Sequence, residues 1–239
     1  MTNEPNLAPV VARTPAPLTR TTWARGFFAV TSGLVTYGLV LQLVLAANND
    51  AGSFGSVPGR VVNTLSFFTV QSNILVAITT GMLAVRLTRS STTFRVLRLT
   101  ALIAITITGI VYHLALAGLQ EMSDKEATAD WVLHTASPIL CLVGWLMFGP
   151  RGQVTRRVAG LCVTFPLAWL AYTLIRGELV DDRFGHPFYP YPFLDVAELG
   201  YGNVAVSIAL IAALFAVLAL LGRVLDRRLS RNLHPRSTT

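Results

Sequence analysis

Residues 199–222 read LGYGNVAVSIALIAALFAVLALLG and contain no Asp, Glu, Lys or Arg. A helix needs about 20 consecutive apolar residues to cross the hydrocarbon core of a bilayer, and this segment is long enough. Backbone groups in lipid must be satisfied internally, which restricts spanning structures to helices and closed barrels. The segment lacks the alternation of polar and apolar residues that is typical of a barrel strand. It therefore predicts a transmembrane helix.

Five other apolar segments precede it, and they predict helices at about 25–47, 66–87, 94–119, 130–148 and 155–176. Of the 239 residues, 53% are hydrophobic and only 13% are charged, about half the charged share of a soluble domain. The expected fold class is therefore all-α: a polytopic membrane protein whose six transmembrane helices form one bundle over residues 23–222. Residues 1–22 are polar and contain prolines, so we expect a disordered tail there. Residues 223–239 form a second, basic tail.

The basic residues are concentrated on one side of this predicted topology. Six crossings place both termini on the same side, and all but four of the 19 Lys and Arg residues fall there. The four on the other side are Arg60, Lys125, Arg176 and Arg183. Because Lys-rich and Arg-rich loops face the cytoplasm, we expect cytoplasmic termini in a plasma-membrane protein. The net charge of +7 then reflects topology and contact with headgroups, so membrane lipids rather than nucleic acid are the expected partners.

The sequence contains no motif of a soluble enzyme: G-x-S-x-G, H-E-x-x-H and the Walker loop do not occur. The two cysteines, Cys141 and Cys162, lie deep in predicted helices, where we expect them to fill apolar space. Of the four histidines, His186 and His234 lie in an outer loop and in a tail, which does not suit a zinc site. We therefore expect no metal and no cofactor.

Polar side chains inside transmembrane helices are the remaining functional candidates, because they are costly there. At 100° per residue, Thr69, Ser72 and Asn73 share one face of the second predicted helix. His113 lies near the outer end of the third helix, and His134 lies near the outer end of the fourth. At 1.5 Å per residue, Thr69, His134 and His113 are about 5, 6 and 9 Å below those ends. The sequence thus predicts a polar cluster at one depth, in the extracytoplasmic leaflet.

Thr69, His134 and Asp130 together suggest a nucleophile with its base. A threonine hydroxyl becomes nucleophilic when an adjacent base accepts its proton, and His134 is the candidate base. Asp130 precedes His134 by four residues and shares its helix face, from which it can orient the imidazole. Arg176 is a candidate to stabilise an oxyanion or to hold an acidic headgroup. Pro138 has no N–H for the His134 carbonyl, so we expect a kink there.

The last outer loop contains FYPYPFLD at 188–195. Residues before proline favour extended conformations, so this loop is not expected to be helical. Its aromatic residues favour the membrane interface. The loop can form a lid over the polar cluster, with Tyr189 or Tyr191 hydrogen-bonding inward, or it can belong to an aromatic belt without a role in the site. Asp195 is a candidate for the site or for an ion pair with Arg176 at the rim.

Each of these polar residues also has a purely structural interpretation. A threonine in a membrane helix usually bonds a carbonyl three or four residues earlier, and Asn73 can simply link two helices. A histidine at this depth can serve as an interfacial hydrogen-bonding group. A Thr69 hydroxyl oxygen within about 3 Å of a His134 nitrogen would favour the catalytic interpretation.

The blocks FFTVQSN at 67–73, DWVLH at 130–134 with Pro138, and YPYPFLD at 189–195 resemble a bacterial family of six-helix membrane proteins. The resemblance extends over all six predicted helices. That family is similar in layout to the eukaryotic androgen-induced proteins, which are intramembrane threonine hydrolases of fatty-acid esters of hydroxy fatty acids. Their nucleophilic threonine lies early in helix two, and their catalytic histidine lies early in helix four, before a proline. The resemblance thus implies Thr69 as nucleophile and His134 as base.

Two departures separate this sequence from the eukaryotic proteins. Ser72 stands where they have Asn or Asp, with Asn73 one position later, and they lack the Tyr-Pro-Tyr-Pro block. The resemblance therefore implies a hydrolase of lipid esters without fixing which ester. Two other functions are compatible with the same residues. One is a small-molecule or proton transporter that uses His113, His134 and Asp130, and the other is a non-catalytic lipid-binding protein.

Overall fold

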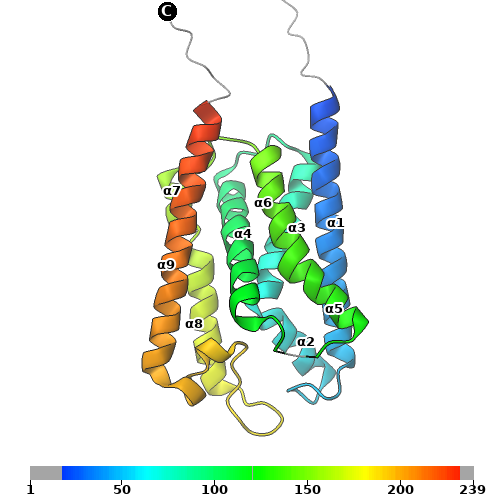
Figure 1. Ribbon diagram of the computed structural model, residues 1–239, viewed down its shortest axis with the longest axis vertical. Coiled ribbons are helices and arrows are strands. Elements are labelled where there is room, and N and C mark those ends of the chain that lie inside the picture. Colours follow the sequence, from blue (N-terminus) through cyan, green and yellow to red (C-terminus); the bar gives the residue numbers. More distant parts are fainter. Residues whose placement is uncertain (1–17, 120, 232–239) are drawn as a thin grey trace, which may run out of the picture.

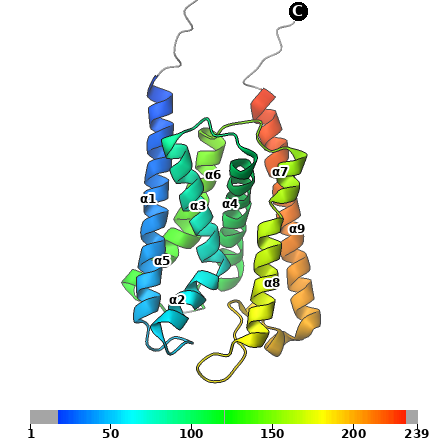
Figure 2. The same ribbon diagram turned by 180° about the vertical axis from the view of Figure 1, so that it is seen from behind.

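The computed structural model describes residues 18–119 and 121–231, and the described chain is built largely of helices (Figures 1 and 2). Six helical segments within it are long and apolar enough to cross a membrane, which confirms the predicted number. They are Thr21–Asn48, Phe68–Val85, Thr92–Leu116, Asp124–Met147, Arg156–Leu179 and Val196–Arg231. The chain is thus a multi-pass membrane protein of the all-α class.

The helices run side by side, and the two described ends of the chain lie at the same end of the bundle (Figure 1). We call this end the terminal end, and we call the opposite end, which holds the loops at 49–56 and 180–195, the loop end. One part of the bundle consists of α1 (Leu18–Asn48), α3 (Phe68–Val85), α4 (Thr92–Val111) and α6 (Ser137–Met147). Helices α8 (Thr164–Leu179) and α9 (Val196–Arg231) lie side by side on one flank of it, as both views show (Figures 1 and 2).

Buried apolar side chains join these helices. Val35 of α1, Val76 of α3 and Ile105 of α4 are fully buried in one cluster. Gly38 lets α1 approach the fourth span closely, because a Cβ there would lie 2.6 Å from Cγ1 of Val132. A second cluster packs α4 against α9. Lipid is as apolar as these side chains, so close packing rather than exclusion of water holds the helices together.

The start of α3 decides the position of Thr69. A short helix, α2 (Val57–Ser66), precedes it, and Phe67 between the two is extended, with φ −68° and ψ 137°. The helix predicted at 66–87 therefore begins at Phe68, and Thr69 lies in its first turn. The break places the backbone N–H groups of that turn at an open helix end, where no earlier helical carbonyl accepts from them.

The fourth and fifth spans also differ from their predicted bounds. The fourth begins with α5 (Asp124–Trp131), before the predicted residue 130, because Ser123 and Glu126 form a capping box at its start. The fifth is divided into α7 (Arg156–Leu161) and α8. The extension of the fourth span gives Asp130 a helical position one turn before His134.

The two predicted tails are shorter where the structure describes them. Helix α9 continues to Arg231, so residues 223–231 are helical rather than part of a tail. Residues 18–22 likewise belong to α1. The rest of both predicted tails, residues 1–17 and 232–239, lies outside the described residues.

Two π-helical turns interrupt the third and fourth spans: η1 (Tyr112–Leu116) at the end of the third span and η2 (Val132–Ala136) in the middle of the fourth. At the end of η2 the N–H of Ser137 bonds the Val132 carbonyl, five residues earlier. Pro138 follows directly, so the irregularity predicted at this proline takes the form of a π turn. Such turns redirect the side chains around them and are frequent at functional sites.

Asp226 of α9 fixes the loop before α7 at the terminal end. It is buried, and its two carboxylate oxygens accept from Gly152 N–H at 3.0 Å and from Val154 N–H at 2.8 Å. An alanine at 226 would leave both backbone donors unpaired, at a cost of about 1–3 kcal/mol each. We expect Asp226→Ala to lower the midpoint of thermal unfolding in detergent by several degrees. Arg227→Ala, at an exposed neighbour, is the control, and an equal midpoint in both variants would contradict this role of Asp226.

Candidate active site

The three residues predicted as nucleophile, base and orienting group lie in contact. The Thr69 hydroxyl oxygen is 3.2 Å from Nε2 of His134, and Nδ1 of His134 is 2.9 Å from Oδ1 of Asp130. Thr69 projects from the first turn of α3, whereas Asp130 and His134 project from one face of the α5 and η2 segment. The order of the groups is that of a Ser-His-Asp triad, with threonine in the place of serine.

Hydrogen bonding determines which nitrogen of His134 carries the proton. Nδ1 faces two acceptors, the Asp130 carboxylate and, at 3.1 Å, the Asp130 backbone carbonyl. Neither acceptor can donate, so Nδ1 carries the N–H and Nε2 presents its lone pair to Thr69. An unprotonated nitrogen within hydrogen-bond reach of the hydroxyl is what a general base requires.

Tyr112 completes this arrangement, and sequence reasoning missed it. Its hydroxyl donates a hydrogen bond to Oδ2 of Asp130, and its ring stacks on the His134 imidazole with centroids 4.1 Å apart. His113 was the candidate on this helix, but it is exposed and its Nε2 bonds a threonine hydroxyl of the neighbouring span at 3.1 Å. A signal that could have identified Tyr112 is its spacing of four residues from Thr108, another polar residue of the same helix face.

Asn73 links the turn of the nucleophile to the turn of the base. Its Nδ2 donates to the Thr69 carbonyl at 2.9 Å and to the Leu133 carbonyl at 3.0 Å. The Leu133 carbonyl needs an outside donor, because the π turn takes the Ser137 N–H and Pro138 has none. Asn73 is fully buried, so it positions these groups and does not face a substrate.

Ser72 links the same turn to α4. It is fully buried, donates to the Thr69 carbonyl at 3.0 Å, and lies 3.1 Å from the Thr108 hydroxyl. Other threonines of the bundle, such as Thr64 and Thr80, donate to the carbonyl four residues earlier in their own helices. Thr69 lies at the start of α3, where the extended residue before the helix removes that geometry. Its hydroxyl is directed across the helix interface instead.

Tyr191 brings the loop at 180–195 to the nucleophile, as one of the two interpretations of this loop predicted. Its hydroxyl oxygen accepts from the Thr69 N–H at 3.3 Å and lies 3.4 Å from the Thr69 hydroxyl oxygen. In α3 the first helical bond is made by the Gln71 N–H, so the earlier N–H groups point out of the helix end. Burial raises the pKa of the Tyr191 phenol, so this group stays neutral and can donate.

Tyr189 is also buried, but its contacts hold the loop at 180–195 against α8. Its hydroxyl donates to Glu178 at 3.1 Å. Burial and this hydrogen bond raise the pKa of Tyr189 to about 12. Its ring packs on Gly177, where an added Cβ would lie 2.1 Å from ring carbon Cε1. The structure therefore brings Tyr191, but not Tyr189, to Thr69.

The two charged residues predicted at the rim of the site, Arg176 and Asp195, lie away from Thr69 and His134. The Arg176 guanidinium carbon lies 5.4 Å from the ring centre of Phe54 and 5.8 Å from that of Phe188, which makes it part of a cation–π stack at the loop end. Asp195 caps the start of α9, where its carboxylate accepts from the Glu198 N–H at 3.1 Å. Neither side chain is brought into contact with Thr69 or His134.

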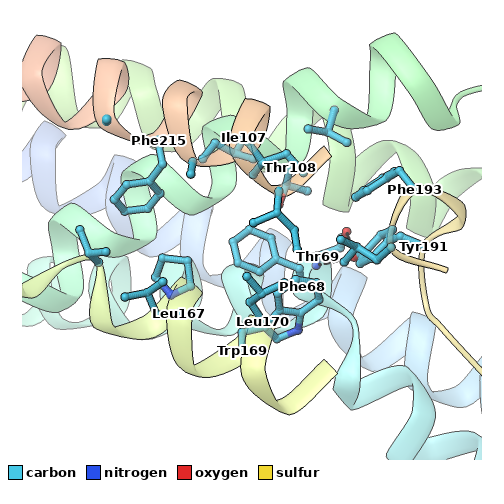
Figure 3. Close-up of a pocket in the computed structure, with 18 of the residues that line it drawn as sticks. Phe68, Thr69, Ile107, Thr108, Leu167, Trp169, Leu170, Tyr191, Phe193 and Phe215 are labelled. Atoms are coloured by element: carbon cyan, nitrogen blue, oxygen red, sulfur yellow. Dashed lines mark hydrogen bonds between the residues drawn. The ribbon is translucent and has the colours of Figure 1, made fainter. Parts of the chain in front are cut away.

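A cavity of about 420 Å³ adjoins Thr69 (Figure 3). It lies between α4, α8 and α9, and its lining is apolar except for a few groups at the loop end, among them Thr69 and Tyr191. Figure 3 shows these two residues close together, with Phe68, Trp169 and Phe193 around them. Its volume is in the range of small-molecule sites. The sequence did not reveal it, because it depends on how α8 and α9 pack against α4, which is distant from them along the chain.

Within the described ranges, no group of three or more His, Cys, Asp or Glu side chains is placed to hold a metal ion. The groups that do meet are a hydroxyl, an imidazole, a carboxylate and a phenol. These are the groups that nucleophilic attack on a carbonyl carbon requires: a nucleophile, its base, an orienting group and a donor for the developing charge.

Comparison with known proteins gives no match: no family model, no curated protein and no solved structure is detectably similar to this chain.

Proposed function

We propose that the protein hydrolyses lipid esters within the membrane, with Thr69 as nucleophile, His134 as general base and Asp130 as its orienting group. The observation that carries this proposal is the 3.2 Å contact between the Thr69 hydroxyl oxygen and Nε2 of His134, whose Nδ1 faces the Asp130 carboxylate. A threonine that only stabilised its helix would bond a carbonyl of its own helix. Its placement opposite an oriented imidazole serves nucleophilic catalysis.

The reaction proceeds in two halves. Nε2 of His134 takes the Thr69 proton as the oxygen attacks the ester carbonyl carbon, and a tetrahedral intermediate forms. As it collapses, the carbon–oxygen bond to the alcohol breaks, and Nε2–H gives its proton to the departing alcohol. Water then attacks the acyl-threonine, again with His134 as base, which releases the fatty acid and restores the Thr69 hydroxyl.

The negative charge of the intermediate requires donors. We assign this role to the Tyr191 hydroxyl and to N–H groups in the first turn of α3 that have no acceptor in their own helix. The Thr69 N–H donates to the Tyr191 hydroxyl oxygen at 3.3 Å, which leaves the Tyr191 O–H to donate to a charge that develops beside the nucleophile. Donors that are fixed before the reaction, in an environment without water, stabilise an oxyanion strongly.

We place this site in the extracytoplasmic leaflet of the plasma membrane. The loops at the terminal end carry basic residues such as Arg86, Arg89 and Arg151, which favours a cytoplasmic location for that end. Thr69 lies in the first turn of the span Phe68–Val85, and His134 lies in the first half of the span Asp124–Met147, so both belong to the half of the bundle on the side of the loop end. A lipid ester can reach this half from the extracytoplasmic leaflet while its chains stay in the bilayer.

A proton or solute transporter needs polar groups near the membrane midplane. Toward the terminal end, however, α4 presents Leu99, Ile103 and Ile107 to α9, and they are buried in an apolar cluster. No observation in the described chain favours transport over hydrolysis.

The experiment that tests the proposal is labelling with a fluorophosphonate in native membranes, followed by mass spectrometry of the modified peptide. We expect the adduct on Thr69, and its loss in Thr69→Ala. Thr79→Ala is the matched control, because Thr79 is a buried threonine of the same helix whose hydroxyl bonds its own helix carbonyl. Wild-type protein that stays unlabelled, while a known serine hydrolase in the same membranes reacts, would refute the proposal.

A further inference from the structure

We infer that the cavity between α4, α8 and α9 holds the acyl chain of the ester. The dimensions of the cavity suit a single unbranched acyl chain of about 12 carbons. The inference rests on the proposed function, because it takes Thr69 as the reacting group. It adds the substrate class and the residues that select it. The cavity touches Thr69 and Tyr191 at one end and is lined by carbon along the rest of its length.

The reaction geometry determines which part of the ester enters the cavity. His134 must give its proton to the departing alcohol, so the alcohol lies on the His134 side of the carbonyl carbon. His134 does not line the cavity, whereas Thr69 does. The other substituent of the carbonyl carbon, the acyl chain, therefore extends away from His134 and into the cavity.

The length of the cavity sets the length of the chain. Its lining runs from Ile208 to Ala219 along α9, and from Ala159 to Leu170 along α7 and α8. At 1.5 Å per residue, both distances are about 16 Å. An extended alkyl chain advances about 1.3 Å per carbon when the C–C bond is about 1.5 Å. Both sides of the cavity thus give room for about 12 carbons.

The far end of the cavity is closed by packed side chains. One turn beyond Ala219, a Cβ at Gly222 would lie 3.6 Å from Cδ1 of Leu99, so α9 and α4 are in contact there. Val158, beside Ala159, is buried in the same apolar cluster. An acyl chain that reaches this point cannot extend further along the helices.

The side of the cavity opens between α8 and α9. Ala212 and Ala216 of α9 and Leu167 of α8 line the cavity and are also exposed at the surface of the chain. The alanine side chains are too short to cover this side of the cavity. An acyl chain can therefore enter the cavity sideways from the bilayer without passing through water. No charged side chain lines the cavity, which excludes an occupant with a charged group along its length.

The test is the dependence of hydrolysis on acyl length, measured with nitrophenyl esters of 4, 8, 12 and 16 carbons on the full chain in nanodiscs. We expect kcat/KM of the wild type to rise up to about 12 carbons and then to stay level. Ala216 lies about 12 Å from Ile208 along α9. Ala216→Phe is therefore expected to leave the shortest ester unaffected and to lower the rate for the 12-carbon ester roughly 10- to 100-fold.

Two further variants make the result decisive. Ala213→Phe places the same ring on an exposed position of α9 that does not line the cavity, and it should behave as the wild type. Ala219→Leu, deeper in the cavity, should spare the 8-carbon ester and lower the rate for the 12-carbon ester. A length profile that is unchanged in Ala216→Phe and Ala219→Leu, or lowered equally at every length in both, would overturn the inference.

A photoreactive 12-carbon fatty amide separates failure of this inference from failure of the proposed function. Cross-linking to α8 and α9 peptides that Ala216→Phe abolishes, in a protein that hydrolyses no ester, would support the cavity as a chain site and reject the hydrolase. Hydrolysis that is independent of chain length, without such cross-links, would reject the cavity as the acyl site and leave the catalytic assignment in place.

Discussion

Asp130→Asn is expected to lower the rate of ester hydrolysis by about 10⁴-fold, as loss of the orienting carboxylate does in a triad. The Asp130 carboxylate accepts from Nδ1 of His134 at 2.9 Å, which keeps Nε2 free to act as base toward Thr69. An asparagine can present its NH₂ group to Nδ1, and the imidazole then turns its lone pair toward the amide and its N–H toward Thr69. The nucleophile would lose its base while the packing of the site stayed almost unchanged.

The measurement is kcat for a nitrophenyl ester, together with the thermal midpoint of each variant. Asp124→Asn is the matched control, since Asp124 is an exposed acid in the first turn of the same helix. Tyr112→Phe removes a donor to Asp130 but keeps the ring stacked on His134, so we expect a smaller loss than in Asp130→Asn. A rate for Asp130→Asn within about tenfold of the wild type would show that Asp130 does not set the tautomer.

The contact between Thr69 and His134 was predictable because it depends on local rules. Helix periodicity places Asp130 and His134 on one face. The rise per residue, counted from the predicted helix starts, placed Thr69 and His134 at similar depths, although the fourth span in fact begins at Asp124 and α3 begins at Phe68. The membrane supplies the remaining constraint, because costly polar groups at one depth favour each other as partners. These three inputs need no knowledge of which helices are neighbours.

Tyr112 was missed because its role depends on backbone irregularity and on partners in other helices. His113 was the candidate because it lies near the end of the third predicted helix, and no local pattern indicated the π turn that begins at Tyr112. Only Pro138 indicated an irregularity near η2. Its consequence, a Leu133 carbonyl that Asn73 satisfies, required the packing of α3 against the fourth span to be known.

The loop residues show a further limit of sequence reasoning. Tyr189 and Tyr191 are two positions apart in the same motif, yet one bonds Glu178 and the other bonds Thr69. Arg176 was expected near a substrate because of its charge, but Phe54, far away in the sequence, provides its partner ring. Contacts of this kind are set by how a loop folds back on the bundle, and no local pattern specifies them.

The division of the bundle suits the proposed chemistry. The nucleophile, the base and the groups that position them belong to α3, α4 and the fourth span, where buried side chains interlock. The cavity lies where α8 and α9 flank this unit. Catalytic groups need fixed geometry, whereas a lipid chain needs a side opening that widens as it moves in. The interlocked helices α3, α4 and the fourth span provide the fixed geometry, and α8 and α9 provide the side opening.

Tyr191→Phe is expected to lower kcat by about 10²- to 10³-fold, the usual effect of removing one oxyanion donor. Because burial raises the pKa of this phenol, it remains protonated at neutral pH and can donate to the developing charge beside Thr69. Its ring packs edge-on against Phe67, with centroids 5.6 Å apart, so the phenylalanine variant keeps the loop in place. Tyr189→Phe is the matched control from the same motif, and it should reduce stability more than rate, because its hydroxyl bonds Glu178. If the two variants lower kcat equally, Tyr191 holds the loop and the oxyanion is stabilised by the backbone N–H groups of α3 alone.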